Sequence, residues 1–425
     1  MRLTDFRQFT FFKVMSFNSL AVFVKMLAGL VSIKVISVWL GPSALALLGN
    51  FKNVKNAVKS FATLGVQSGV VTYTAATKNN SKQRAIVLST AFYMILFSSL
   101  FLGIFSILFS KSIGWYLFKT NDYQICILAF GLLLPLYAFQ VFSIAVINGL
   151  QKFKALVLLS IIASVFALLL TVVFIVYYKT LGALMALAVV ESLIVFVYLI
   201  YFVKNRLLLP ELKWSLVSKS YAKKLTSYSL MTFTTALIIP FSMLFLRNNL
   251  INHYGLVQAG LWEAVNRISD YYLLILISGI GMYYLPKLSK IDNDRAFRKE
   301  IVGYFKTFMP LCLLMFLVIY GCRSLIVDIA LSTSFASVKN LLIYQLIGDF
   351  FKIASYAFAQ QFLAKRLTIP YIVTEVLFFA VYLLFAQLFI VEYGVQGVLY
   401  GYCLAYVAYF LMMLFCFRKA LNISF

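Results

Sequence analysis

The sequence predicts an all-α polytopic membrane protein with twelve transmembrane helices in two pseudo-symmetric six-helix lobes around a central cationic cavity. Three observations support this fold class: the apolar composition, a series of long apolar segments and a weak internal repeat. Of the 425 residues, 63% are hydrophobic and only 12% are charged, and the mean hydropathy is +0.95. A soluble protein must cover its surface with polar groups, so this composition excludes a soluble globular fold.

Twelve segments of the chain are long and apolar enough to cross a bilayer. About 20 apolar residues span the hydrocarbon core as a helix. The predicted spans are Phe17–Leu40, Ser43–Tyr73, Ile86–Phe109, Tyr123–Leu150, Ala155–Tyr178, Leu181–Val203, Leu225–Ile251, Leu256–Tyr284, Ile301–Cys322, Leu341–Leu363, Tyr371–Ile390 and Val395–Phe417.

Basic residues are distributed unequally between alternate loops. With a cytoplasmic N-terminus, 23 Lys and Arg residues fall on the cytoplasmic side. The opposite side receives five: Lys111, Lys119, Lys179, Arg323 and Lys339. The positive-inside rule therefore predicts that both termini are cytoplasmic. The net charge of +24 reflects topology and contact with membrane lipids, and it does not indicate a nucleic-acid partner.

A weak repeat relates the two halves of the chain. Four predicted elbows match in pairs at offsets of 214 and 212 residues, namely Leu40-Gly41 with Tyr254-Gly255 and Leu181-Gly182 with Tyr393-Gly394. We therefore predict an N-terminal lobe of residues 1–207 and a C-terminal lobe of residues 208–425. Because six is an even number, both lobes enter the membrane from the same side, and the cavity is expected between them.

Nine basic residues lie inside the predicted spans, where a cation costs about 2.5 to 3.5 kcal/mol. The first lobe holds five of them, Lys25, Lys34, Lys52, Lys55 and Lys59, against the single acid Glu191. Lys52, Lys55 and Lys59 follow i, i+3 and i+7 spacing, which places them on one face of a helix. Three like charges with so few local acids predict a stripe that binds an anion.

The second lobe is electrically balanced. Its cations Arg247, Arg267, Lys306 and Lys352 face the acids Glu263, Asp270, Asp349 and Glu375. Glu263, Arg267 and Asp270 share one helical face, and Gln345, Asp349, Lys352 and Gln360 form a polar stripe on another span. Two interpretations are open. The pairs are fixed salt bridges between helices, or protonation or cation binding at Asp270 and Asp349 couples the protein to an ion gradient.

Other chemistry is excluded by what the chain lacks. His253 is the only histidine, which argues against a His-based metal site or a Ser-His-Asp triad. The five cysteines show no paired spacing and are expected to pack in the core. No GxxxxGK[ST] motif is present, so the sequence does not predict direct ATP hydrolysis. We expect a transporter without a cofactor or metal rather than an enzyme.

Several segments together resemble a known family. They are Gly41-Pro42 through Lys52, Gly260-Leu261-Trp262 through Asp270, Tyr284 through Ser289, Gln345 through Asp349 with Lys352, and Thr374-Glu375-Val376. The chain is similar to the Wzx-type polysaccharide flippases of the multidrug/oligosaccharidyl-lipid/polysaccharide exporter superfamily. The likeness is strongest to the branch that moves the lipid-linked repeat of enterobacterial common antigen or a related O-antigen.

The resemblance implies a function by alternating access in the bacterial inner membrane. The substrate would be an undecaprenyl-diphosphate-linked oligosaccharide, and a proton or sodium gradient or the membrane potential would supply energy. Polymerase and chain-length proteins of the same pathway would be partners. Charged cavity residues of the family correspond here to Lys25, Lys34, Lys52, Arg247, Asp270 and Lys352, and the helical stripe adds Lys55 and Lys59 to this set.

Two other functions fit a protein of this class. A cation-coupled drug exporter of the same superfamily would be expected to line its first lobe with acids, and the five lysines argue against it. A membrane polymerase or ligase would need a sizeable outward loop, and no predicted outward loop is long.

Overall fold

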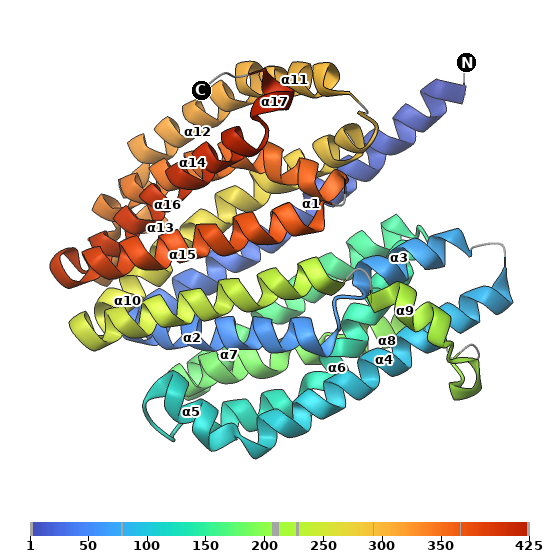
Figure 1. The fold of residues 1–425 in the computed structure, drawn as a ribbon. Coiled ribbons are helices and arrows are strands. Elements are labelled where there is room, and N and C mark those ends of the chain that lie inside the picture. Colours follow the sequence, from blue (N-terminus) through green and yellow to red (C-terminus); the bar gives the residue numbers. More distant parts are fainter. Residues whose placement is uncertain are drawn as a thin grey trace. The chain divides into compact units, whose positions relative to one another are not determined.

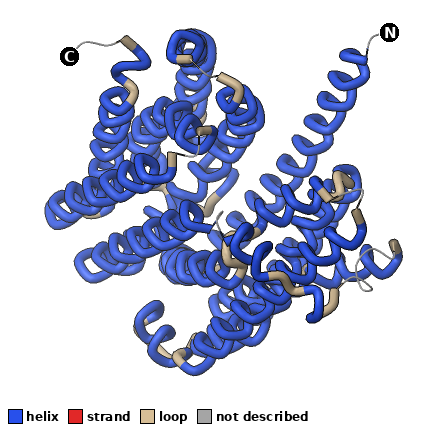
Figure 2. The backbone as a smooth tube through the Cα atoms, turned by 45° about the vertical axis from the view of Figure 1, so that its right-hand side comes forward, coloured by secondary structure: helices blue, strands red, loops and turns tan. Residues whose placement is uncertain are grey.

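The computed structural model describes residues 3–77, 80–205, 212–226, 229–291, 293–365 and 367–422, and within these ranges every regular element is a helix (Figure 2). The predicted lobe boundary between residues 207 and 208 lies outside the described residues, as do Lys78, Arg206 and Arg366, which contribute to the predicted loop charge. Contacts divide the chain into two units. Unit 1 comprises Met1–Trp39 and Asn50–Leu237, and unit 2 comprises Leu40–Gly49 and Ile238–Phe425.

Unit 1 is a helical bundle built around α4, α6 and α7, which pack side by side (Figure 1). Its core includes Phe142 of α6 with Tyr198 and Phe202 of α8, all buried among aliphatic side chains. The elements are α1 (Leu3–Trp39), most of α2 (Gly41–Ala62), α3 (Gln67–Ala76), α4 (Ser81–Leu108), α5 (Ser110–Phe118), α6 (Gln124–Gly149), α7 (Phe153–Leu193), α8 (Val195–Lys204), η1 (Trp214–Leu216) and α9 (Lys219–Thr226).

Unit 2 packs α14 and α15 against α16, and nearly all of α10 belongs to it. Aromatic rings fill this unit, and Tyr402, Tyr406 and Tyr409 line one face of α16. The elements are α10 (Ser229–Ser289), α11 (Asp294–Gly303), the π-helical turn η2 (Tyr304–Phe308), α12 (Met309–Gly321), α13 (Arg323–Ala330), η3 (Thr333–Phe335), α14 (Val338–Ala364), α15 (Thr368–Tyr393), α16 (Val395–Cys416) and α17 (Arg418–Leu421).

Three of the four predicted elbows are confirmed. Gly41, Gly255 and Gly394 have φ values of 73°, 79° and 56°, a region that glycine enters without the steric cost of a Cβ atom. The fourth elbow is at Lys179, with φ 49° and ψ −127°, and the prediction at Leu181-Gly182 is wrong. Gly182 is helical, and a Cβ atom there would collide with the carbonyl of Phe174. Close packing, rather than backbone conformation, therefore accounts for this glycine.

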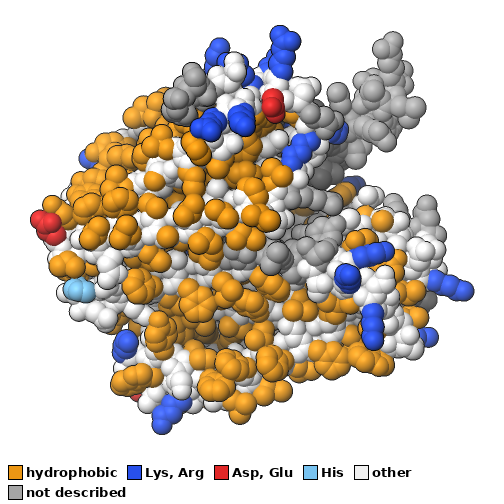
Figure 3. Space-filling view, viewed as in Figure 1, with side chains coloured by type: hydrophobic (Ala, Val, Ile, Leu, Met, Phe, Trp, Pro, Cys, Tyr) orange, Lys and Arg blue, Asp and Glu red, His pale blue; other side chains and the backbone are white. Residues whose placement is uncertain are grey.

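Eight helical segments of the described chain are long and apolar enough to cross a membrane. One of them, Phe153–Lys204, has 52 residues, more than twice the length of about 20 that one crossing needs, and the kink at Lys179 divides it. Hydrophobic side chains cover much of the visible surface, whereas Lys and Arg gather near its margins (Figure 3). The all-α polytopic membrane class is confirmed, and the count of twelve spans and the central cavity stay predictions.

Candidate functional site

The lysine stripe of α2 lies within unit 1 and contacts Glu191 of α7. Lys55 Nζ is 3.1 Å from Glu191 Oε1, and Lys59 pairs with the second carboxylate oxygen, Oε2. Each lysine has a further contact: Lys55 donates to the carbonyl of Leu187 at 3.1 Å, and Lys59 lies 4.1 Å from the centre of the Tyr137 ring. Lys55 and Lys59, four residues apart on α2, therefore lie on one face of the helix, as predicted.

The expectation that the stripe lacks acids is wrong for two of its members. Lys55 and Lys59 share the carboxylate of Glu191, so these two lysines and the glutamate together carry a net charge of +1. The partner is 136 residues away from Lys55 in the sequence, so helix periodicity could not identify the pair. The only signal was that Glu191 is the single acid in the first six predicted spans, and no sequence signal pointed to Tyr137.

The other predicted lysines of unit 1 differ in exposure. Lys52, on the same face of α2, and Lys34, on α1, are partly buried, whereas Lys25 of α1 is exposed. The role of all three in binding an anion stays a prediction.

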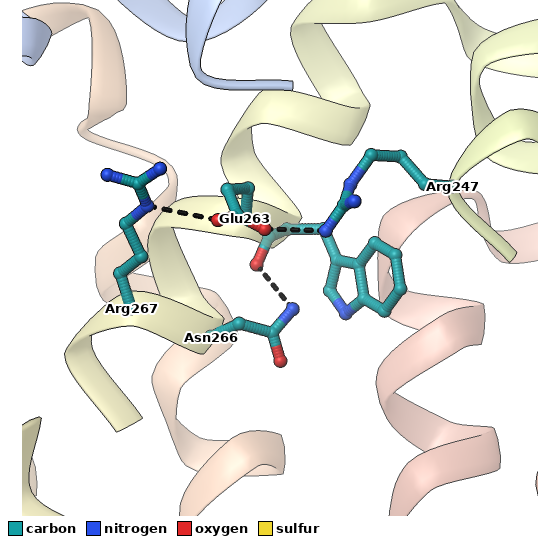
Figure 4. Close-up of polar contacts among 5 residues, drawn as sticks. Arg247, Glu263, Asn266 and Arg267 are labelled. Atoms are coloured by element: carbon teal, nitrogen blue, oxygen red, sulfur yellow. Dashed lines mark hydrogen bonds and ion pairs between the residues drawn. The ribbon is translucent and has the colours of Figure 1, made fainter. Parts of the chain in front are cut away.

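Unit 2 contains a buried ion cluster on α10 (Figure 4). Glu263 accepts from Arg247 Nη2 at 2.5 Å and from Arg267 Nε at 3.0 Å, so the predicted pairing of Glu263 with Arg267 is confirmed. Arg247 is only 2% exposed and stacks over Trp262, with 5.2 Å between its Cζ and the ring centre. Arg247 and Glu263 come from opposite sides of the Gly255 kink, so their ion pair ties the two arms of α10 together.

A second polar cluster of unit 2 surrounds Asp349 of α14. This side chain is fully buried and accepts from Ser269 at 2.5 Å, from Tyr402 at 2.6 Å, from Gln345 at 3.3 Å and from Tyr272. Its neighbour Lys352 lies 5.6 Å from the centre of the Tyr406 ring, and Tyr409 donates to Glu375 at 2.8 Å. Hydroxyl groups and an amide therefore satisfy the Asp349 carboxylate. Asp270, at the edge of this region, is exposed.

These clusters consist of charged and hydroxyl side chains that can recognise charged groups. Lysine ammonium groups bind phosphates as mobile point charges and do not impose one rigid geometry. Within the described residues, no group of three or more His, Cys, Asp or Glu side chains is arranged to hold a metal ion. The cysteine expectation is partly wrong, because Cys322 and Cys416, at helix ends, are exposed while Cys126 and Cys312 are buried.

Solved transporter structures share this fold. A multidrug resistance MATE family transporter of the MOP superfamily, in an inward-facing conformation, superposes with a TM-score of 0.69 at 18% identity, covering 94% of this chain and 96% of that one. The lipid II flippase MurJ, in an inward closed conformation, gives a TM-score of 0.72 at 14% identity, with 96% and 89% covered. At these identities the likeness establishes the fold.

Curated relatives match nearly end to end. The lipid III flippases of Escherichia coli K12 and of Shigella flexneri are each 28% identical over 405 residues, which is 94% of this chain and 96% of theirs. The family model described as "Polysaccharide biosynthesis protein" matches residues 40–340, well over half of the 425 residues. The chain is therefore a multi-pass membrane protein and belongs to this polysaccharide biosynthesis family.

Proposed function

We propose that this protein is a flippase that moves an undecaprenyl-diphosphate-linked oligosaccharide, of the O-antigen or enterobacterial common antigen type, from the cytoplasmic to the periplasmic leaflet of the inner membrane. The observation that carries the proposal is the match to curated lipid III flippases over 94% of the chain. The buried cations of α2 supply the chemistry such a substrate needs, because lipid tails exclude its diphosphate and its sugars.

The proposed mechanism divides the substrate between protein and bilayer. The diphosphate would bind the lysine group of α2, while the polyprenyl chain remains in the hydrocarbon. Alternating access would expose the same site first to the cytoplasm and then to the periplasm. Coupling to a proton or sodium gradient or to the membrane potential, cytoplasmic termini, and contact with polymerase and chain-length proteins all belong to this proposal.

The charge of unit 1 favours this function over drug export. Multidrug transporters share the fold at 18% identity. A cationic drug, however, would be repelled by the buried group of Lys55, Lys59 and Glu191, because this group carries a net positive charge. The flippase relatives also indicate a transporter rather than a catalyst.

Translocation in proteoliposomes tests the proposal. We expect the purified wild-type protein to move a fluorescently labelled undecaprenyl-diphosphate oligosaccharide out of reach of an external quencher. A variant with Lys52, Lys55 and Lys59 all replaced by Gln should lose this activity. Because it also leaves Glu191 without its lysine partners, its folding is checked by gel filtration and circular dichroism. Deletion of the gene should cause the matching lipid-linked saccharide to accumulate on the cytoplasmic face. Wild-type translocation by the triple variant would show that the stripe is structural.

A further inference from the structure

The acid that pairs with the lysine stripe is far more exposed than the lysines themselves. The Glu191 side chain is 44% exposed, whereas the side chains of Lys55 and Lys59 are 2% and 8% exposed. The carboxylate therefore covers two buried ammonium groups from the accessible side. An incoming solute would meet Glu191 before it met either cation.

Glu191 also lies near the middle of its span. The kink at Lys179 and the end of α8 at Lys204 bound this helical arm, and Glu191 is 12 residues from the first and 13 from the second. At 1.5 Å per residue, about 18 Å of helix separates it from either end. An exposed carboxylate at this depth is costly in lipid, so its exposed side is expected to face a polar, hydrated space.

The two lysines have contacts that do not depend on Glu191. Lys55 donates to the Leu187 carbonyl, and Lys59 lies over the Tyr137 ring. Both contacts can hold the ammonium groups in place when the glutamate moves away. Two buried cations with one removable carboxylate form a site that another anion can occupy, and breaking a buried pair without replacing the anion is strongly unfavourable.

We propose that Glu191 is an internal counter-ion, which occupies the Lys55–Lys59 site when no substrate is bound and is displaced by the diphosphate of the substrate. The proposal rests on the proposed function and assigns Glu191 a positioning role within it. Glu191 swings toward the polar space, and the diphosphate oxygens accept the hydrogen bonds that it releases. When the carboxylate returns, it competes with the bound diphosphate and promotes its release.

Binding of a short isoprenyl diphosphate tests this role. Purified protein in nanodiscs would be titrated with farnesyl diphosphate, and with farnesyl monophosphate for comparison. We expect Glu191→Gln to bind the diphosphate at least tenfold more tightly than wild type, because the competing anion is gone. Lys55→Gln and Lys59→Gln should each bind it more weakly. Translocation by Glu191→Gln should be slower than wild type because product release is impaired.

A control is Glu300→Gln, which removes a carboxylate of α11 from another ion pair, 2.7 Å from Lys287 Nζ, in which Glu300 is 16% and Lys287 43% exposed. It should bind farnesyl diphosphate as wild type does.

If Glu191→Gln folds, as judged by gel filtration and circular dichroism, and binds no more tightly than wild type, Glu191 is not a displaced counter-ion. Should Glu191→Gln fold poorly, farnesyl diphosphate present during purification is expected to restore its yield, and Glu191→Asp should bind more tightly than wild type. Failure of both results would also overturn the proposal.

The two proposals fail in different ways. Wild-type protein that translocates the labelled oligosaccharide, with Glu191→Gln binding unchanged, contradicts the counter-ion role alone. Tighter diphosphate binding by Glu191→Gln, with no translocation by wild type, supports the counter-ion role and contradicts the flippase function.

Discussion

Lys179 and Gly394 adopt nearly the same backbone conformation at matching elbows of the two halves. Their φ and ψ values are 49° and −127° for Lys179 and 56° and −127° for Gly394. The offset between them, 394 − 179 = 215, is close to the 214 residues that separate Gly41 from Gly255. This region of φ and ψ is open essentially only to glycine, so Lys179 carries backbone strain that Gly394 avoids.

Replacing Lys179 by glycine should therefore stabilise the protein. Strain of this kind costs about 1 to 3 kcal/mol, and we expect Lys179→Gly to melt at a higher temperature than wild type in detergent. Lys111→Gly is the control, since Lys111 lies in helix α5, where glycine is unfavourable. A lower melting temperature for Lys179→Gly would contradict the strain argument.

The contacts of Asp349 favour a structural role over ion coupling. Four side chains donate to its buried carboxylate. In asparagine an NH2 group replaces one of the two accepting oxygens, so some of these donors would face another donor. We expect Asp349→Asn to lower thermal stability by about 1 to 3 kcal/mol, because buried polar groups would lose their acceptor. Its translocation activity, measured in proteoliposomes, should still respond to an imposed proton or sodium gradient.

Asp270→Asn is the companion variant, because Asp270 is exposed. We expect a smaller change in stability there. Loss of the gradient response in either variant, with substrate binding retained, would favour the coupling interpretation.

At the scale of elements, the two arms of α10 and the start of α2 meet at one buried point of unit 2. A Cβ atom at Gly49 of α2 would lie 2.7 Å from Arg247 Cζ and 2.7 Å from Glu263 Oε2. A side chain at this position would push apart the ion pair that ties the arms together. Breaking a buried pair is costly, because each charge loses the partner that compensates its desolvation.

We therefore expect Gly49→Val to reduce both folded yield and melting temperature, and Gly49→Ala to do so less. Gly279 of α10 provides the control, because no neighbouring atom lies within 4 Å of a Cβ placed there. Gly279→Ala should be neutral or slightly stabilising. Equal effects of alanine at both positions would show that the packing at Gly49 is not restrictive.

The sequence predicted features that depend on neighbouring residues, and it did not predict contacts between residues far apart in the chain. Apolar segments and glycines identified the helical class and three elbows, because each depends on residues close together in sequence. The elbow at Lys179 was missed because a strained lysine gives no signal, while Gly182 gave a false one. The Glu263–Arg267 pair follows from i, i+4 spacing on one helix. By contrast, Glu191 meets Lys55 only through packing of α2 against a helix far along the chain.

At the scale of the whole molecule, the distribution of basic residues predicts the orientation of the chain. With both termini cytoplasmic, Lys119 at the end of α5 is periplasmic and Lys224 on α9 is cytoplasmic. In intact cells, a membrane-impermeant maleimide should label Lys119→Cys and should not label Lys224→Cys. The natural residue Cys322 is exposed and lies on the predicted periplasmic side, so it must first be replaced by Ser. Labelling of Lys224→Cys without labelling of Lys119→Cys would show that the predicted orientation is wrong.

The distance in sequence between the lysine stripe and its counter-ion also has a consequence for biogenesis. Lys55 and Glu191 are 136 residues apart, so a ribosome that adds about 5 to 20 residues per second needs roughly 7 to 27 s to reach the glutamate. During that interval α2 carries its lysines without the carboxylate that later compensates them. We therefore expect α2 to stay in a hydrated part of the insertion machinery until α7 emerges. Truncation of the message before codon 191 should therefore leave a nascent protein whose second helix is poorly retained in the bilayer and rapidly degraded.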